Sequence, residues 1–454
     1  MGSEKTKELK EIIALIKEGG STKVKLAITD VDGILRGKLI HLEKFLSIAE
    51  KGFGFCDVVF GWDAADVAYE NTDYTGWHSG YPDAPATIDL TTFRQIPWDQ
   101  DTPFFIADFA NNKAAGAVCP RSLLKEIKQQ AVSAGFDPKF SQEFEWFNFK
   151  ETSKELEDKS FVNPEPLTPG MFGYSILRSS SQSTYFNALF DQLNQFQVPI
   201  EGLHTETGPG VYEAAIMYSE ILEAADRAVL FKTGVKEIAY KHGVIASFMA
   251  KWSQQYPGCS GHVHQSLWDE SSNLFYDPDQ KDHMSGLMQS YIAGQLHCMP
   301  QILPMFAPNI NSYKRLVEGA WAPTTLTWGV DNRTTALRAL PGSKGSTRLE
   351  TRVCGSDTNP YLVMAACLAS GLYGVKNKLK LQPQTKGNGY RDDQYGTLPA
   401  TLQEATQAMK TSYLAKELFG KAFVNHFVQT REWEVRQFAP VVTDWELKRY
   451  FEII

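Results

Sequence analysis

The sequence predicts an α+β protein, with a small sheet-rich domain followed by a larger domain in which helices alternate with short strands. Three observations support this fold class. Turn-forming residues and alternating apolar positions fill most of the first 110 residues. Helical apolar spacing recurs in blocks after residue 120, and short acidic or histidine-bearing segments with a period of two separate those blocks. A chain of 454 residues is long enough for both domains.

The first expected element is a helix with its cap, over residues 1–20. Residues 4–18 have helical apolar spacing, and Gly19 and Gly20 follow as a C-cap signal. The sheet-rich domain is then predicted to cover residues 21–115. Within it, residues 24–28 and 34–40 have the pattern of strands, and residues 30–33 form the turn between them.

The larger domain is predicted to cover residues 116–454 and to begin near Cys119-Pro-Arg-Ser122. Ser122 is the expected N-cap of a helix that ends near Gly135. Further helices are expected at residues 220–229, 284–299 and 360–372. The sequence shows no internal repeat and no low-complexity tract, so an α+β unit with strands facing a funnel fits this half.

The composition limits the classes of function. The chain has 45 basic and 53 acidic residues and a formal net charge of −8, so we expect no nucleic-acid partner and no anionic membrane surface as partner. Six cysteines are dispersed without CxxC spacing, which favours neither a disulfide framework nor a thiolate zinc site. The polar N-terminus and the lack of a membrane-length apolar run predict a cytoplasmic location.

Four short motifs carry candidate ligands for metal ions and phosphate groups. Alternate residues of a strand point to the same face, so each motif presents its ionisable groups together. The carboxylates would repel one another strongly on one sheet face unless divalent cations neutralised them. The neighbouring arginines suit phosphate, and the pattern therefore indicates phosphoryl-transfer chemistry. The motifs are Glu143-Phe-Glu145, Glu206-Thr-Gly-Pro-Gly-Val-Tyr-Glu213, His262-Val-His264 and Arg348-Leu-Glu350-Thr-Arg352.

Each motif taken alone also has an ordinary structural interpretation. A Glu-x-Glu pair is typical of a half-exposed edge strand, and a His-x-His pair is more often structural than functional. Glu206 and Glu213 would lie on opposite faces of one continuous strand, and we expect Gly208-Pro209-Gly210 to break it so that both turn inward. An Arg-x-Glu-x-Arg segment is also the pattern of a surface salt-bridge ladder, which contributes little stability. The order and context of all four motifs favour a site.

Along nearly its whole length, the sequence resembles the glutamine synthetase family. The resemblance rests on the four motifs and on Asp30-Val-Asp-Gly-Ile-Leu-Arg-Gly-Lys, Gly258-Cys-Ser-Gly-His-Val-His-Gln-Ser, Lys314-Arg-Leu-Val, Asn332-Arg-Thr-Thr-Ala-Leu-Arg and Asn359-Pro-Tyr-Leu. It implies a small β-grasp N-terminal domain followed by a glutamine synthetase-type catalytic half-barrel domain. It also implies self-association into stacked rings, expected to be dodecamers, with active sites between neighbouring subunits.

The resemblance implies two groups of metal ligands and a nucleotide site. One metal site would use Glu145, Glu206 and Glu213. The other would use Glu143, His262 and Glu350. Such oxygen-rich ligation suits Mg²⁺ or Mn²⁺, with two or three ions per site. The cosubstrate ATP would contact Glu201, His264, Ser266, Arg338 and Arg348.

The remaining roles concern the acid, the phosphoryl group and the amine. Gly258, Arg315 and Arg352 would bind the amino-acid substrate, expected to be glutamate. Arg333 would stabilise the transferring phosphoryl group. Asp63 resembles the aspartate that a neighbouring subunit lends to the amine pocket.

Two positions depart from the family pattern. Glutamine synthetases carry a glutamate before Ala-Pro in a flap that closes over the site and takes a proton from ammonium, and Trp321 occupies that position here. An indole cannot accept this proton, although its face can hold a cation. The Trp-Ala-Pro flap resembles the branch that ligates glutamate to polyamines, ethanolamine or alkylamines. Pro257 stands where family members place an asparagine before the glycine of the substrate loop, which bears on the glutamate contacts.

The predicted function is an ATP-dependent ligase that joins the γ-carboxylate of glutamate to an amine through a γ-glutamyl phosphate. Glutamine synthetase itself, using ammonia, is the main alternative, in which Trp321 only packs the flap shut. Two other classes are a ring-forming homologue without catalysis and a phosphagen-type kinase with similar arginine chemistry. Because every proposed metal ligand is present, the sequence favours an enzyme.

Overall fold

The computed structural model describes residues 2–454, with side chains from Leu9 onward. The expected N-terminal helix is present as α1 (Gly2–Glu18), and Met1 lies outside the described residues. Leu9, Ile12 and Ile16 face the interior and are buried. Gly20 has a φ of 68°, and the amide of Ser21 donates to the Ile16 carbonyl, so the two glycines end the helix as predicted.

The N-terminal sheet has five strands in the order β2-β1-β5-β4-β3. Only the central pair, β1 and β5, is parallel, and all other neighbours are antiparallel. Helix α2 (Leu42–Ile48) packs on this sheet, where Phe45 stacks on Phe105 with ring centroids 4.8 Å apart. The strands are β1 (Lys23–Thr29), β2 (Leu35–His41), β3 (Phe53–Cys56), β4 (Asp83–Ile96) and β5 (Thr102–Asp108).

The second sheet curls into a half-barrel and has nine strands, with the path β12-β13-β14-β11-β6-β8-β7. Its long central strand, β6 (Asp137–Phe149), pairs with β11 through its first half and with β8 through its second half. Strands β9 and β10 also pair with β6. The other strands are β7 (Ile200–Thr205), β8 (Val211–Ile216), β9 (Ser219–Glu220), β10 (Ile245–Ser247), β11 (Val263–Trp268), β12 (Trp328–Val330), β13 (Leu337–Leu340) and β14 (Arg348–Thr351).

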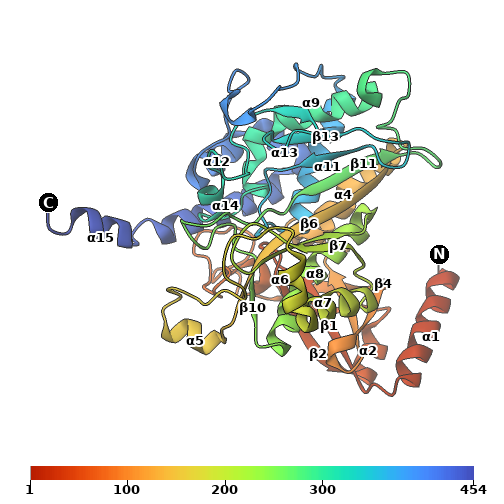
Figure 1. Ribbon diagram of the computed structural model, residues 1–454. Helices are drawn as coiled ribbons and strands as arrows, with labels where there is room; N and C mark the ends of the chain where they lie inside the picture. Colours follow the sequence, from red (N-terminus) through yellow and green to blue (C-terminus); the bar gives the residue numbers. More distant parts are fainter. Residues whose placement is uncertain (1) are drawn as a thin grey trace.

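Three helices pack against β6 (Figure 1). They are α4 (Pro120–Ser133), α8 (Ile221–Lys241) and α11 (Pro360–Lys376), and α11 in turn packs against α9 (Gly286–Ile302). The other helices are α3 (Lys113–Gly116), α5 (Ser153–Asp158), α6 (Ile176–Ser181), α7 (Ser183–Gln195), α10 (Ser312–Arg315), α12 (Leu402–Thr411), α13 (Tyr413–Phe419), α14 (Lys421–Phe438) and α15 (Asp444–Tyr450). None of the helices within residues 2–454 is long and apolar enough to cross a membrane.

The start of α4 differs from the prediction. Helix α4 begins at Pro120, and its N-cap residue is Cys119, so Ser122 lies inside the first turn and is not the cap. Proline at a first helical position loses no hydrogen bond and has the right φ, which explains the earlier start. The helix predicted over residues 220–229 is the first half of α8, and Glu220 caps it by accepting the amides of Leu222 and Glu223.

The turn between β1 and β2 joins the N-terminal sheet to the larger domain. Asp30 accepts the amides of Asp32 and Ile34, and Gly33 has a φ of 82°. A Cβ at Gly33 would lie 3.0 Å from the Cα of Asn359, so the backbones approach closely here. The side-chain nitrogen of Asn359, Nδ2, donates to the backbone carbonyls of Asp30 and Val31. These hydrogen bonds hold the turn against the start of α11.

Candidate active site

Strand β6 presents Glu143 and Glu145 on the face that the helices do not cover. The alternate residues Phe144 and Trp146 are buried on the helical face, where Phe144 stacks on Phe231 with centroids 5.7 Å apart. This apolar packing determines which face of the strand is buried. A shift of the strand register by one residue would bury the two glutamates and expose the two aromatic rings. The predicted sharing of one face by Glu143 and Glu145 therefore follows from the strand alternation.

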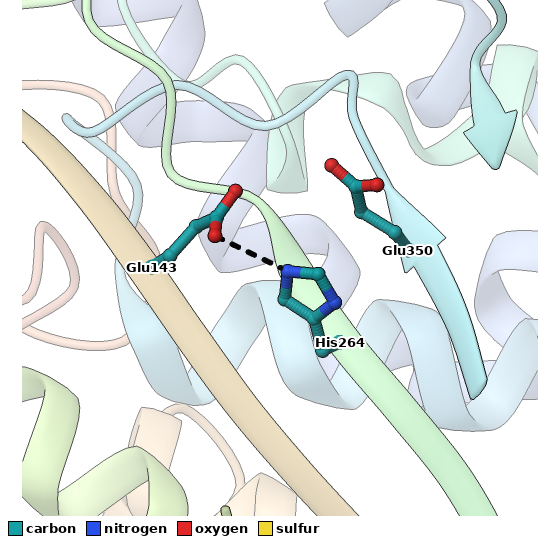
Figure 2. Close-up of side chains that lie close together, drawn as sticks. All are labelled: Glu143, His264 and Glu350. Carbon is teal, nitrogen blue, oxygen red and sulfur yellow. Dashed lines mark ion pairs between the residues drawn. The ribbon is translucent and has the colours of Figure 1, made fainter. Parts of the chain in front are cut away.

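The first cluster combines Glu143 with residues from β11 and β14. His262 Nδ1 lies 2.8 Å from Glu143 Oε1 and 3.3 Å from Glu350 Oε1. His264 Nε2 lies 3.4 Å from Glu143 Oε2, and Figure 2 shows this pair with Glu350 on the neighbouring strand. Ligand atoms of Glu143, His264 and Glu350 all lie within 4.8 Å of one another. His264, predicted to contact ATP, thus also belongs to this cluster.

The cluster has the electrostatics of a cation site. Burial raises the pKa of Glu143, but His264 and His262 outweigh it and hold that pKa well below its usual value. Burial and the Arg352 charge lower the pKa of His262 to about 4, so its imidazole is neutral at pH 7. His262 Nε2 is buried without a hydrogen-bond partner among the described residues. The nitrogen that faces Glu143 and Glu350 is Nδ1, so a neutral imidazole nitrogen and two carboxylates converge here, which fits a divalent cation.

Glu350 is held by arginines on both sides. It is fully buried, and its Oε2 accepts a hydrogen bond of 2.8 Å from Arg338 Nη1. Arg352 donates to Oε1 of the same carboxylate. Arg338 also donates to Asp331. The structure therefore places Arg338 against Glu350 and Asp331. The other four residues predicted to contact ATP line a cavity beside this cluster.

The second cluster lies along one row of three adjacent strands. Glu145 on β6 pairs in register with Glu213 on β8, and Glu213 pairs with His204 on β7. His204 Nε2 lies 3.4 Å from Glu213 Oε1, and His204 Nδ1 lies 4.0 Å from Glu206 Oε1. The three residues whose ligand atoms lie within 4.8 Å of one another are His204, Glu206 and Glu213.

Glu145 stands between the two clusters. Its Oε2 accepts the Ser260 amide at 2.7 Å. Burial, followed by the charges of Glu206 and Glu143, raises its pKa above the usual value, although the Ser260 amide and Arg315 oppose this. Burial also raises the pKa of Glu213 to about 8, in spite of the hydrogen bond from His204. Such raised values indicate uncompensated negative charge, which a bound cation would relieve.

The turn between β7 and β8 brings Glu206 and Glu213 to the same face, as the sequence predicts. Glu206 follows β7 directly, and its amide donates to the Val211 carbonyl across the turn. Gly210 has a φ of 72°, and a Cβ there would lie 2.6 Å from the Asn148 carbonyl oxygen. Only glycine allows this close approach.

A cavity of about 310 Å³ opens beside the first cluster. Besides Glu143, its lining includes four residues predicted to contact ATP, namely Glu201, His264, Ser266 and Arg348. Arg348 Nε lies 3.3 Å from His264 Nδ1, and the backbone of Gly345 and Ser346 closes one side. Lys139, Tyr218 and Trp268 also line this cavity, although no sequence motif indicated them.

The predicted substrate residues lie around the loop that precedes β11. A Cβ at Gly258 would lie 2.4 Å from the Ala250 carbonyl oxygen and 2.9 Å from Arg315 Cγ. Arg315 is buried, and its guanidinium donates to the carbonyls of Val353 and Arg352 and to Ser260 Oγ. These partners are groups of the chain itself, so Arg315 holds β14 and the Gly258 loop together in this structure.

Arg333, Trp321 and Asp63 lie outside the two clusters. The Arg333 carbonyl accepts from Arg352 Nε at 3.2 Å, and the Arg333 guanidinium forms no ion pair with the described residues. Trp321 is 59% exposed and has a φ of 56°. Asp63 is buried in the N-terminal half, where it accepts the amides of Ala65 and Val67 and the indole N–H of Trp433. The structure therefore does not join Asp63 to the clusters of its own chain.

His204 and Tyr174 are the site residues that sequence reasoning missed. His204 is two residues before Glu206 on β7, so the same alternation rule could have found it. Tyr174 stacks on the His204 ring, with centroids 4.5 Å apart, and its amide donates to the Thr205 carbonyl. Burial, Glu206 and Glu213 raise the Tyr174 pKa to about 12, while Arg333 lowers it. Nothing in the local sequence pattern indicates this contact.

Comparison with known proteins places this fold and site in a class of ligases. The profile of the family described as "Glutamine synthetase, catalytic domain" matches residues 117–450. The chain belongs to the glutamine synthetase family, whose members generally use ATP and divalent metal ions.

Individual relatives include both glutamine synthetases and amine ligases. The chain is 54% identical over 450 residues to type-1 glutamine synthetase 2 of Dictyostelium discoideum, covering 98% of this chain and 86% of that protein. It is 36% identical to the glutamate–isopropylamine ligase of a Pseudomonas species, covering 100% of both chains. A solved GmaS–ADP complex is similar with a TM-score of 0.84 and 25% identity, covering 97% of this chain and 99% of that one.

Proposed function

We propose that this ligase joins the γ-carboxylate of glutamate to an organic amine, using ATP and passing through a γ-glutamyl phosphate. The observation that carries the amine assignment is Trp321, which stands where glutamine synthetases have a flap glutamate. The family relationship supports the ATP-dependent ligation, and the glutamate–isopropylamine ligase supports an amine acceptor.

The arrangement of Trp321 supports a role at the amine side of the site. Its loop residue Ala322 is fully buried, so the indole projects from an anchored backbone. Burial raises the pKa of Tyr390, while the charges of Arg352 and Arg315 and the Trp321 backbone lower it. The Tyr390 hydroxyl is buried without a hydrogen-bond partner among the described residues. An exposed apolar ring there accommodates a carbon chain and offers no carboxylate to select ammonium.

The polar groups of the chain have roles that follow from their positions. We assign Glu201, His264, Ser266 and Arg348 to ATP because they line one cavity beside the first cluster. Arg333 has no competing ion pair with the side chains that the structure describes, so its guanidinium is available to neutralise the phosphoryl group during transfer. Divalent cations held by the two clusters would supply charge neutralisation at the phosphates. Arg352 and the flap would orient the acid and exclude water from the acyl phosphate.

The ion identity, the assembly and the location are further parts of the proposal. Carboxylate-rich ligation supports Mg²⁺ or Mn²⁺. Ring assembly, expected to be dodecameric, is supported by the C-terminus, which extends from the body as α15 (Figure 1) and exposes Trp445 and Phe451. The six cysteines form no disulfide in the described structure, in keeping with a reducing cytoplasmic compartment.

A second candidate is glutamine synthetase activity with ammonia. It is favoured by the 54% identity to a protein named as a type-1 glutamine synthetase. In this case the amine pocket would select ammonium without the flap carboxylate, and Trp321 would act only as a cover.

The test is phosphate release from ATP by the purified protein with glutamate, Mg²⁺ or Mn²⁺, and a panel of acceptors. The panel contains ammonium, methylamine, isopropylamine, ethanolamine and putrescine, and mass spectrometry identifies the γ-glutamyl product. We expect kcat/KM for one organic amine to exceed that for ammonium by about 10-fold or more, a difference of about 1.4 kcal/mol. A preference for ammonium supports the second candidate, and no turnover with any pair supports a non-catalytic homologue.

A further inference from the structure

The structure assigns an additional metal ligand, His204. We propose that its Nε2 binds the same cation as Glu206 and Glu213, and that this nitrogen gives the site a preference for Mn²⁺ over Mg²⁺. The inference rests on the divalent-metal part of the proposed function, and it does not depend on which amine is used. The predicted ligand set for this cation contained three carboxylates and no nitrogen.

The strand register brings His204 to the cation position. His204 and Glu206 are two residues apart at the end of β7, and His204 lies directly opposite Glu213 on β8. The Nε2–Oε1 distance to Glu213 is 3.4 Å. Two ligand atoms that are each ~2.1 Å from one ion, at right angles, lie about 3 Å apart, so this separation fits two ligands of a single cation.

The hydrogen bond at the other ring nitrogen orients His204 for ligation. Nδ1 lies 3.2 Å from the Thr205 carbonyl oxygen, which can only accept. The proton of the neutral ring therefore belongs on Nδ1, and Nε2 presents its lone pair toward Glu213. A backbone carbonyl behind a ligating histidine is the usual arrangement that fixes the tautomer. Tyr174 stacks on the ring with centroids 4.5 Å apart and restricts its rotation.

The position of Glu145 leaves room for this assignment. Glu145 Oε2 accepts the Ser260 amide at 2.7 Å, and its second oxygen accepts no hydrogen bond from the described residues. Glu206 Oε2 accepts the Thr207 amide at 2.7 Å, and Glu206 Oε1 lies 4.0 Å from the His204 ring at Nδ1. The free donors around this position are therefore carboxylate oxygens plus one imidazole nitrogen. Imidazole binds Mn²⁺ more readily than the harder Mg²⁺, which prefers oxygen ligands and water.

The experiment measures cation binding without substrates, so it remains informative even if the amine assignment fails. Mn²⁺ binding is followed by the loss of the free-ion electron paramagnetic resonance signal, and Mg²⁺ binding is followed by calorimetry. For His204→Gln we expect Mn²⁺ affinity at one site to fall by about 10-fold or more, with a much smaller change for Mg²⁺. For His204→Asp, which replaces nitrogen by oxygen, we expect the Mn²⁺ to Mg²⁺ affinity ratio to fall while Mg²⁺ binding is retained.

Two controls make the result decisive. His297→Gln removes an exposed imidazole from α9 and should leave both affinities unchanged. In a His262→Gln, His264→Gln background, ¹⁴N coupling to bound Mn²⁺ should persist and should disappear when His204→Gln is added. If His204 is only an ion-pair partner of Glu213, its replacement will leave Mn²⁺ affinity unchanged or tighter, and either result overturns the proposal.

Discussion

The guanidinium of Arg121 on α4 and the carboxylate of Asp226 on α8 form two parallel hydrogen bonds, at 2.9 and 2.7 Å. Both side chains are almost fully buried, with 1% and 2% of their surfaces exposed. The second amino group of Arg121 also donates to Asp89 and Asp108 of the N-terminal sheet. One arginine therefore ties this sheet to the helices that support β6.

Removal of Arg121 should destabilise the protein strongly, because the buried Asp226 carboxylate would lose its only ion pair among the described residues and keep only the Tyr361 hydroxyl as a donor. We expect Arg121→Met to reduce the free energy of unfolding by about 3–5 kcal/mol. Denaturant unfolding at fixed protein concentration measures the effect. The double variant Arg121→Met, Asp226→Leu should recover part of the loss; equal or greater destabilisation of the double variant would contradict this account.

Gly258 should tolerate no side chain, because a Cβ there would meet a carbonyl oxygen at 2.4 Å and Arg315 at 2.9 Å. For Gly258→Ala we expect the KM for glutamate to rise by about 10-fold or more, since a shift of 1 Å in a binding loop has effects of this size. The matched control is Gly286→Ala at the start of α9, where nothing lies within 4 Å of the new Cβ. Similar kinetics for both variants would show that the Gly258 loop does not bind substrate.

Trp321 should determine the choice of acceptor. Trp321→Glu places a carboxylate on the exposed flap, and we expect it to increase the preference for ammonium over the favoured organic amine by about 10-fold. Trp321→Phe should keep the original preference. The charge control is Tyr413→Glu on α13, where the side chain is 82% exposed. An unchanged amine profile in Trp321→Glu would mean that the indole does not contact the acceptor.

Glu213 should be essential for turnover but not for folding. Glu213→Gln keeps the shape of the side chain and removes a charge that the proposed cation requires, so we expect kcat to fall by about 100-fold or more. Its thermal midpoint should not fall, because burial already raises the pKa of this carboxyl to about 8. Glu417→Gln, at an exposed position of α13, serves as the control. Full activity in Glu213→Gln would remove this residue from the proposed site.

His426 should make stability sensitive to acid. Burial, and next the Arg431 charge, lower its pKa from 6.5 to about 4 in the folded protein. The folded state then binds this proton less readily than the unfolded state. The contribution of neutral His426 to the free energy of unfolding is therefore complete above pH 6.5 and is lost as the pH falls toward 4. At about 1.4 kcal/mol per pKa unit, this loss in the free energy of unfolding amounts to about 3 kcal/mol.

The replacement His426→Phe tests this effect, since it keeps an aromatic ring against Tyr74, whose centroid lies 5.8 Å away. We expect the variant to lose less stability than the natural protein between pH 6.5 and 4, measured by denaturant unfolding. Parallel pH profiles for the two proteins would rule out His426 as the source of the acid sensitivity.

Sequence reasoning succeeded where the rule was local and geometric. Alternation along one strand predicted that Glu143 and Glu145 share a face, and the glycines after Glu206 predicted the turn that brings Glu213 beside it. Alternation along β7 also places His204 on the face of Glu206, but it does not show that His204 faces Glu213 on another strand. His204 is opposite Glu213 only because β7 and β8 have a particular register, and the sequence of neither strand alone determines that register.

Contacts between distant parts of the chain are also beyond local sequence rules. Arg315, which is predicted to bind the substrate, also donates hydrogen bonds to three groups of its own chain. Tyr174 could not be predicted because it reaches the site from an irregular segment before α6, through backbone contacts with Thr205. Asp63, which is predicted to act at the site of a neighbouring subunit, accepts the indole N–H of Trp433, more than 300 residues away in the chain.

Glu143 of the first cluster and Glu145, which stands between the two clusters, lie on the same uninterrupted strand, β6. Two residues of a strand span about 6.5–7 Å, and covalent geometry scarcely lets this length vary. The spacing between these two carboxylate positions is therefore set by the peptide backbone, whereas the flap that carries Trp321 is a loop. Because the proposed acceptor contact lies on that loop, a protein built this way could exchange one acceptor for another during evolution without altering the residues proposed to handle phosphate.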